Sequence, residues 1–223
     1  PPKRRAMNIE QARYNMIEQQ IRPWEVLDQE VLSRLGEVRR EQFVPEDCRD
    51  LAFIDTQIPL PGGQCMLEPK VEARLLQELA VQPGERVLEI GAGSGYMAAL
   101  LASQAQHVLS IEIDPALALF ARDNLRRAGI DNVSVFEGDG ARGYAAESPF
   151  DIIVLSGSVA ELPQEVLEQL KVGGRLVAVV GDAPAMAAML VTCTAPGAYR
   201  RETLFETAAP RLRGFGEPTR FRF

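Results

Sequence analysis

The feature that most constrains the fold is an apolar run that breaks into closely spaced glycines. Residues 87–90 (Val-Leu-Glu-Ile) are followed by Gly-Ala-Gly-Ser-Gly at 91–95, and helix-compatible residues occupy 96–101. This pattern predicts a strand, a tight glycine turn and a helix. Glycines let a ligand lie against the main chain, and the first turn of a helix offers unpaired N–H groups. We therefore expect a small-molecule site here, the alternative being an ordinary strand-to-helix turn.

A second apolar run, residues 107–114, follows the predicted helix and ends in acidic residues. A doubly wound fold places a carboxylate about 20 residues after the glycines, on ribose hydroxyls of the ligand. Glu112 is therefore the predicted ribose ligand. The glycines run G-x-G-x-G, with Tyr96 where a dinucleotide pattern has its third glycine, and Glu89 precedes the turn. An acid at Glu89 suits an amino group and not a pyrophosphate, which favours an aminoacyl ligand.

These two strands resemble those of class I S-adenosylmethionine-dependent methyltransferases, in which such a loop holds the methionine part of the cofactor. The resemblance implies S-adenosylmethionine as cofactor, with Glu89 facing its amino group directly or through water. Asp139 and Gly140 would line the adenine. The expected cofactor-binding residues are Glu89, Gly91, Ala92, Gly93, Ser94, Gly95, Glu112, Ile113, Asp139, Gly140 and Ser156. Structural roles remain the alternatives, namely an exposed strand acid for Glu89, a turn former for Asp139 and a loop residue for Ser156.

Composition excludes several other functions. The formal net charge of −7 argues against a nucleic acid as the main ligand, because such binding requires a basic surface. The three cysteines form no C-x-x-C motif and there is one histidine, so we expect no disulfide framework and no metal site. No apolar run reaches membrane-spanning length and no signal-peptide core follows the first charges, so we expect a cytoplasmic protein without a membrane partner. Oligomeric state is not readable from the sequence.

The rest of the chain alternates between strand and helix patterns. We expect strands at 86–90, 107–113, 132–136, 150–155 and 174–180, with helices at 94–103, 115–128 and 163–170. A closing hairpin at 186–194 and 199–207 is split by Pro196-Gly197. The predicted fold class is α/β, a Rossmann-like methyltransferase with a mostly parallel seven-stranded sheet, helices on both faces and a C-terminal antiparallel hairpin.

The residues before the glycine turn predict an N-terminal helical extension. Apolar spacing indicates helices from Asn8 to about Ile21 and from Asp28, a plausible N-cap, to about Val38. A long non-periodic stretch from 39 to Pro61 is a candidate lid or substrate wall. We therefore divide the chain into an extension with a substrate-side loop, 7–61, and a methyltransferase domain, 62–223. Residues 1–6 resemble a cloning remnant or a start-site difference and are left out of this division.

Several stretches together resemble protein-L-isoaspartate O-methyltransferases. The matching residues are 40–45 (Arg-Glu-Gln-Phe-Val-Pro), 52–60, 63–64, 88–96, 138–140, 149–154 and 169–177. The resemblance implies methyl transfer from S-adenosylmethionine to the α-carboxylate of isoaspartyl residues in damaged proteins, which begins their repair. It also implies a damaged protein or peptide as partner, and candidate catalytic residues Asp55, Gln64 and the residue at position 67.

Position 67 departs from the family pattern. The family carries Gln-Thr-x-Ser-x-Pro with the serine in the active site, whereas this chain has Gln64-Cys-Met-Leu67-Glu68-Pro. Leucine forms no hydrogen bond, and Glu68 adds negative charge where an anionic carboxylate should arrive. Two alternatives to the isoaspartyl reaction therefore remain. The fold could serve another acceptor, for which Asp55 or Glu68 could act as base, or it could bind the cofactor without catalysis.

Overall fold

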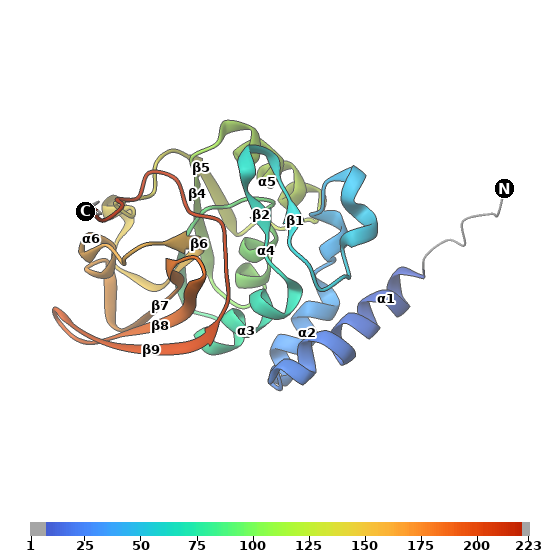
Figure 1. The fold of residues 1–223 in the computed structure, drawn as a ribbon, viewed down its shortest axis with the longest axis horizontal. Helices are drawn as coiled ribbons and strands as arrows, with labels where there is room; N and C mark the ends of the chain where they lie inside the picture. The colour runs from blue at the N-terminus through green and yellow to red at the C-terminus, as the bar shows by residue number, and fades with distance from the viewer. Residues whose placement is uncertain (1–7, 220–223) are drawn as a thin grey trace.

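The computed structural model describes residues 8–219 and builds them around one seven-stranded sheet (Figure 1). The strand order is β5-β4-β3-β6-β7-β8-β9, with β3 to β7 parallel to one another and β8 antiparallel to both of its neighbours. The strands are β3 (Arg86–Ile90), β4 (His107–Glu112), β5 (Val133–Glu137), β6 (Phe150–Val159), β7 (Leu170–Asp182), β8 (Ala185–Ala195) and β9 (Ala198–Glu206). The α/β fold class predicted from the sequence is thereby confirmed, including the C-terminal hairpin.

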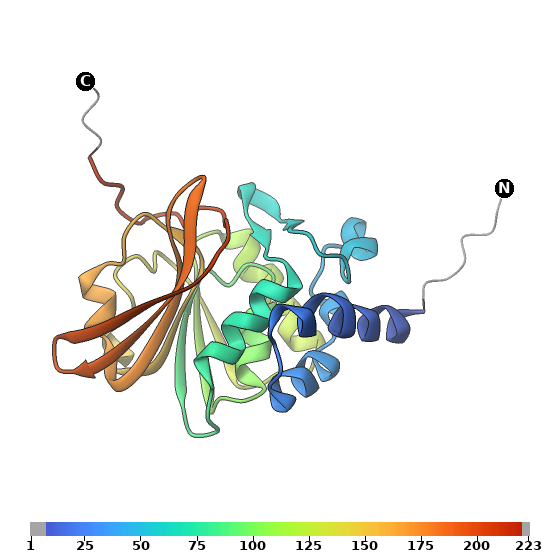
Figure 2. The same cartoon turned by 60° about the horizontal axis from the view of Figure 1, so that its bottom comes forward.

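Helices cover the two faces of the sheet unequally (Figure 2). The helices α3 (Pro69–Leu79), α4 (Tyr96–Ala102) and α5 (Pro115–Arg127) lie on one face, and the short α6 (Gln164–Leu167) lies on the other. Alternate strand residues explain this division, because successive side chains of a strand point to opposite faces. Val87 and Val108 pack with α3 to α5, whereas Leu88 and Leu109 pack with α6.

The N-terminal extension folds as short helical segments. They are α1 (Ile9–Met16), the π-helical η1 (Ile17–Ile21), η2 (Arg22–Trp24) and α2 (Gln29–Glu37), followed by three 3₁₀ turns, η3 (Arg40–Gln42), η4 (Glu46–Leu51) and η5 (Pro61–Gly63). The α-helix expected up to Ile21 changes to π geometry after Met16. Asp28 is the N-cap of α2 as predicted, because its carboxylate accepts from the N–H groups of Glu30 and Val31. The stretch expected to be irregular, 39–61, holds η3, η4, the first residue of η5 and the two-residue strand β1 (Ile58–Pro59). β1 pairs with β2 (Cys65–Met66), which lies beyond that stretch.

After residue 150, three elements differ from their predicted bounds by more than two residues, namely α6, β6 and β7. The helix expected at 163–170 is the four-residue α6, because β7 already begins at Leu170. β7 is irregular near its start, where a Cβ on Gly174 would lie 2.8 Å from the Lys171 carbonyl oxygen. Both β6 and β7 extend beyond their predicted ends, and their register shifts between Val154 and Ser158. A pattern of apolar residues alone does not show such a shift.

The core is continuous across the boundary expected at residue 61. Buried Met16, Leu35 and Phe43 belong to the same hydrophobic cluster as Leu76 of α3 and Leu100 of α4. The extension therefore packs onto the face of the sheet that carries α3, α4 and α5. Residues 1–7, which include those left out of the domain division, and 220–223 lie outside the described part of the chain. Within residues 8–219, no helix is both long and apolar enough to cross a membrane.

Candidate active site

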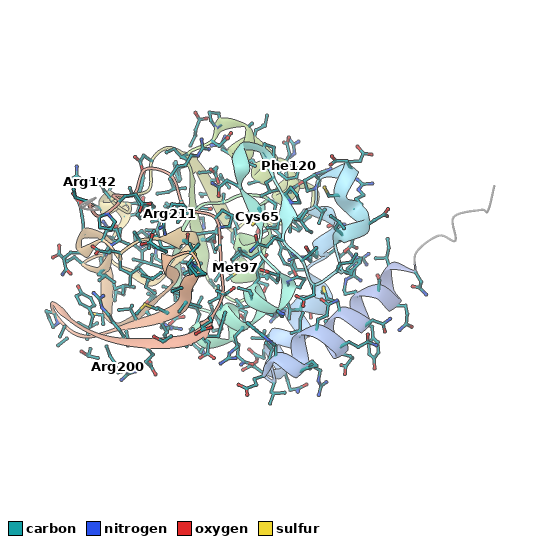
Figure 3. The ribbon with its side chains drawn as sticks, viewed as in Figure 1. Cys65, Met97, Phe120, Arg142, Arg200 and Arg211 are labelled. Carbon is teal, nitrogen blue, oxygen red and sulfur yellow. The ribbon has the colours of Figure 1, made fainter. Side chains whose placement is uncertain are left out.

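A cavity opens at the carboxyl ends of β3, β4 and β6, where ligands bind in open α/β sheets. Its wall combines the glycine turn with Leu60, which follows β1, and with residues of β2, α3 and the chain after β9. Figure 3 labels two members of this wall, Cys65 of β2 and Met97 of α4, near the centre of the molecule. Ten of the fourteen site residues expected from the sequence line it: Gln64, Leu67, Gly91, Ala92, Gly93, Ser94, Glu112, Ile113, Gly140 and Ser156.

The glycine turn is held against the end of β4. Gly91, Gly93 and Gly95 all have positive φ, at 94°, 54° and 86°, which explains why glycine occupies each position. Glu112, which is 4 % exposed, accepts from the Gly93 N–H at 2.9 Å through Oε2 and from the Asp114 N–H at 3.0 Å through Oε1. Its carboxylate therefore shapes the loop and still has free lone pairs at the position expected for the ribose.

Gly95 serves packing instead of lining the cavity. A Cβ at this position would lie 3.2 Å from the Ala121 carbonyl oxygen and 3.3 Å from Leu125 of α5. The glycine lets α4 begin close against α5. Gly95 is therefore part of the frame that supports the loop.

Glu89 lies beneath the cavity wall and is fully buried. Its Oε1 accepts from the Ser110 hydroxyl at 2.6 Å and its Oε2 from the Ser156 hydroxyl at 2.8 Å. Burial raises the pKa of this carboxyl to about 8, against the effect of the two hydroxyl hydrogen bonds. Ser156 lines the cavity, so Glu89 reaches it through that hydroxyl and not directly.

At the end of the cavity expected for the adenine, Gly140 lies against β3. A Cβ there would lie 2.7 Å from Ile90 Cγ2, so only glycine allows this approach. Asp139 is not part of the wall, and its Oδ1 accepts from the Ala141 N–H at 2.9 Å. The turn-forming role described as the alternative for Asp139 accounts for this contact.

On the side expected for the acceptor, the structure brings Gln64 and Leu67 to the cavity but not Asp55. The Asp55 carboxylate accepts from Lys70 Nζ at 3.0 Å outside the wall. Glu68 also lies off the wall, with its Oε2 accepting from Gln57 Nε2 at 3.4 Å. Leu67 is 7 % exposed and, with Leu60 and Met66, makes this side of the cavity apolar.

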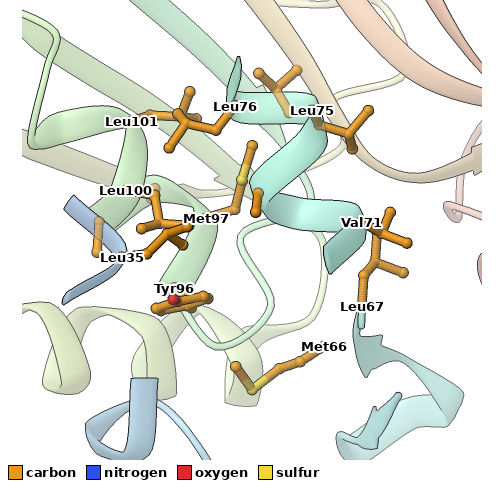
Figure 4. Close-up of a cluster of buried hydrophobic side chains, with 14 of the residues drawn as sticks. Leu35, Met66, Leu67, Val71, Leu75, Leu76, Tyr96, Met97, Leu100 and Leu101 are labelled. Atoms are coloured by element: carbon orange, nitrogen blue, oxygen red, sulfur yellow. The ribbon is translucent and has the colours of Figure 1, made fainter. Parts of the chain in front are cut away.

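A buried charged group that the sequence analysis did not single out lies behind Leu67. Arg40, 1 % exposed, donates from Nη2 to the Leu67 carbonyl oxygen at 2.8 Å and from Nη1 to Glu72 Oε1 at 3.3 Å. Its guanidinium lies 4.8 Å from the centre of the Tyr96 ring. Glu72 and Tyr96 both line the cavity. Figure 4 shows Met97 of α4 reaching toward the helix that carries Leu75 and Leu76, and Leu67 beside Val71.

The segment after β9 returns over the cavity. The Ser158 N–H donates to the Pro210 carbonyl oxygen and the Leu212 N–H donates to the Ser158 carbonyl oxygen, both at 2.8 Å. A Cβ on Gly91 or Gly157 would lie 2.9 or 2.8 Å from the Leu212 side chain, so both glycines make room for it. Arg213 also lines the cavity and donates to Asp114 Oδ2 at 3.1 Å. We call residues 208–216 the C-terminal strap.

Some of the unpredicted wall residues had a signal in the sequence and others had none. Glu72 lies three and four residues before Leu75 and Leu76, so it falls on the buried stripe of α3, where an acid is unusual. Leu212 and Arg213 follow no recognisable pattern. Within residues 8–219, no group of three His, Cys, Asp or Glu side chains is placed to hold a metal ion.

Comparison with known proteins connects this geometry to one family. The family model described as protein-L-isoaspartate(D-aspartate) O-methyltransferase (PCMT) matches residues 11–204. A protein-L-isoaspartate O-methyltransferase of Methanoculleus marisnigri is 43% identical over 169 residues, covering 76% of this chain and 77% of that protein. Protein-L-isoaspartate O-methyltransferase 1 of Rhodopseudomonas palustris is 44% identical over 193 residues, covering 86% and 79%.

Solved structures share the fold. A putative protein-L-isoaspartate O-methyltransferase from Plasmodium falciparum, in complex with S-adenosyl-L-homocysteine, superposes with a TM-score of 0.76 at 22% identity, covering 93% of this chain and 99% of that one. A second structure, named protein-L-isoaspartate O-methyltransferase, has a TM-score of 0.71 at 28% identity and covers 91% and 66%.

Proposed function

The chain belongs to the protein-L-isoaspartate O-methyltransferase family, and from that premise we propose that it transfers methyl from S-adenosylmethionine to the α-carboxylate of isoaspartyl residues in damaged proteins or peptides. The observation that carries the proposal is the continuous cavity that joins the glycine turn and Glu112 to Gln64 and Leu67. One cavity that holds a cofactor-type loop and the family's acceptor-side residues suits transfer between two bound molecules.

The residues present fit S-adenosylmethionine. Gly91 and Gly93 leave the turn without side chains, and Glu112 keeps free lone pairs for ribose hydroxyls. Gly140 and Ile113 line the end of the cavity that we assign to the adenine, and Ile113 gives that end an apolar side chain. When bound, the cofactor supplies an electrophilic methyl group on a sulfonium. We assign Ser156 a supporting place beside the loop, with Glu89 behind it.

The protein's own contribution is positioning and exclusion of water. A carboxylate acceptor is already ionised at neutral pH and needs no base, so the remoteness of Asp55 from the cavity is compatible with the reaction. The strap covers the glycine turn through Leu212, which helps to keep water away from the reacting groups. Gln64 Nε2 donates to the Arg211 carbonyl oxygen at 3.4 Å and so links the acceptor side to the strap.

In this proposal residues 7–61 form a helical extension with a substrate-side loop and residues 62–223 the methyltransferase domain, although the two share one core. The extension contributes Leu60 to the cavity wall. We place the protein in the reducing cytoplasm, where the free thiols of Cys48, Cys65 and Cys193 would stay reduced.

The test is transfer of labelled methyl from S-adenosylmethionine to an isoaspartyl peptide and to its aspartyl twin. Methylation of the isoaspartyl peptide alone is the expected result, and methylation of neither peptide would contradict the proposal. The Leu67→Ser variant restores the family hydroxyl at this position. It should raise the rate if the hydroxyl acts on the acceptor, whereas Leu67→Ala controls for the loss of side-chain volume.

A second candidate function is methylation of a less polar acceptor by the same fold. The observation that favours it is the apolar acceptor side made by Leu60, Met66 and Leu67. A screen of small hydroxyl and carboxyl acceptors with the wild-type protein tests this alternative. Turnover of such an acceptor, with both peptides left unmodified, would select it over the isoaspartyl reaction.

A further inference from the structure

Glu72 is a buried acid with one oxygen unused. The residue is 5 % exposed and lines the cavity beside Leu67 and Tyr96. Arg40 occupies Oε1, but Oε2 is buried and has no hydrogen-bond partner among residues 8–219. A buried carboxylate oxygen left without a donor costs about 1–3 kcal/mol, so such an atom on a cavity wall indicates a donor that arrives with the ligand.

The position of Glu72 in the cavity decides which part of the ligand it meets. We assign the adenine to the end of the cavity lined by Gly140 and Ile113, and the ribose to Glu112. A cofactor laid along the glycine turn from these points directs its aminoacyl end toward α3 and α4. The wall there includes Glu72, with Tyr96 and Met97 of α4.

The other acid that could meet an amino group is occupied. Both Glu89 oxygens accept hydroxyl hydrogen bonds, from Ser110 and Ser156, and Glu89 is not part of the wall. Glu68 is directed to Gln57 outside the wall. Of Glu68, Glu72 and Glu89, Glu72 is the acid that lines the cavity and also has a buried oxygen without a hydrogen-bond partner.

We propose that Glu72 binds the α-ammonium group of the methionine portion of the cofactor, with Oε2 accepting its hydrogen bond while Arg40 holds Oε1. The inference rests on the proposed function only in taking S-adenosylmethionine as the ligand. It does not depend on the acceptor. Glu72 is here a cofactor-binding residue, and Arg40 is a positioning residue that acts through it.

The charges around Glu72 make this contact dependent on pH. The groups that face it are Arg40, Glu68, Cys65, Tyr96 and Glu89, of which only Arg40 is a cation. Burial raises the pKa of Glu72 to about 7 despite Arg40, while burial raises those of Cys65 and Tyr96 to about 12. The thiol and the phenol therefore stay neutral over the working range, and Glu89 is the neighbour whose titration needs a control.

An ammonium ligand requires the ionised form of Glu72. Below pH 7 the carboxyl must lose its proton as the ligand binds, so affinity rises with pH up to about 7 and levels off above it. At pH 6 binding should release close to one proton per ligand, which calorimetry measures by comparing buffers of different ionisation enthalpy. The Glu89→Gln variant should release the same number of protons. In the wild-type protein Glu89 keeps its two hydroxyl partners when the ligand binds, so its protonation should not change.

Two ligands isolate the contact. S-adenosylhomocysteine carries the amino group, and 5′-methylthioadenosine lacks the amino-acid end but keeps adenosine and sulfur. The Glu72→Gln variant preserves shape and removes charge, and it should bind S-adenosylhomocysteine at least about 10-fold more weakly, the lower range for one charged hydrogen bond. Its affinity for 5′-methylthioadenosine should stay within about twofold. The Glu68→Gln variant, a matched acid off the wall, should change neither affinity.

Each outcome decides the inference. An equal loss for both ligands, or no loss for S-adenosylhomocysteine, overturns it, and so does binding of S-adenosylhomocysteine to the wild-type protein at pH 6 without proton release. The proton count needs no variant, so it decides even if Glu72→Gln fails to fold. Selective loss with no peptide methylation would leave the Glu72 contact standing and overturn the isoaspartyl reaction. Failure of the wild-type protein to bind either ligand overturns both.

Discussion

Arg40 and Glu72 should depend on each other in the folded protein, with a measurable coupling energy between them. Arg40 contacts three groups inside the core: the Leu67 carbonyl oxygen at 2.8 Å, Glu72 Oε1 at 3.3 Å and the Tyr96 ring at 4.8 Å. We consider replacement of Arg40 by Met, replacement of Glu72 by Val, and both changes together. Methionine and valine supply apolar side chains without charge, which lets each partner be removed alone or together with the other.

The expected magnitude follows from these contacts. Arg40→Met removes a charged hydrogen bond worth about 1.5–3 kcal/mol and leaves the Glu72 carboxylate buried without its cation. Removal of one member of a buried pair typically costs about 3–5 kcal/mol in the free energy of unfolding, whereas removal of both can be close to neutral. The double variant should therefore be more stable than the sum of the single losses implies, by at least about 2 kcal/mol.

Urea unfolding followed by circular dichroism at pH 9, where Glu72 is ionised beside Arg40, gives the four free energies of unfolding, and the double-mutant cycle gives the coupling. The loss in Arg40→Met should shrink at pH 5, because protonated Glu72 no longer carries a charge that needs a partner. Additivity of the two single variants within about 0.5 kcal/mol would refute the reasoning, since it would mean that neither charge depends on the other.

Three further predictions follow from the site. Glu112→Ala removes the acceptor for the Gly93 and Asp114 N–H groups, so it should destabilise the protein by about 3 kcal/mol. It should also weaken S-adenosylhomocysteine binding at least about 100-fold, and an unchanged affinity in calorimetry would contradict the ribose assignment. The unliganded protein should lose stability as pH rises from about 5 to 8. The pKa values of Glu72 and Glu89 are raised to about 7 and 8 in the folded state, so both carboxyls hold protons there and release them on unfolding. Urea midpoints that rise over this pH range would contradict those protonation states. Leu212→Ala should lower stability by about 2–3 kcal/mol and speed dissociation of S-adenosylhomocysteine in stopped flow, whereas an unchanged dissociation rate would mean that the strap does not cover the ligand.

The part of the fold that the sequence predicted well is the part governed by local periodicity. β3, the glycine turn and Glu112 follow one another within a short span, and each is marked by its own residue types. The short α6 was predicted too long, because a helical spacing of apolar residues does not reveal that β7 begins at Leu170. Such patterns do not predict contacts that depend on the register between strands.

The candidate site was likewise predicted well where local spacing decides a residue's place, and poorly where side-chain direction or a distant contact decides it. Ten of the expected residues line the cavity. Glu89, expected to face the ligand's amino group directly or through water, lies beneath the wall and binds Ser110 and Ser156. Spacing places Glu89 next to the turn without giving the direction of its side chain. Leu212 reaches Gly91 from far along the chain, so only the assembled sheet could show that contact. Glu72 could have been noticed as an acid on an apolar helix stripe.

The C-terminal strap also sets when the cavity can be completed during synthesis. Chains emerge from the ribosome with the N-terminal end first, and the glycine turn with its first strands is available long before the strap. The wall over Gly91 requires Leu212, and the link from Arg213 to Asp114 requires one residue more. A nascent chain can thus build the sheet around β3 while its ligand cavity still lacks a side. The finished cavity appears only after residue 213 has left the exit tunnel, so chains released earlier would fold without a closed binding site.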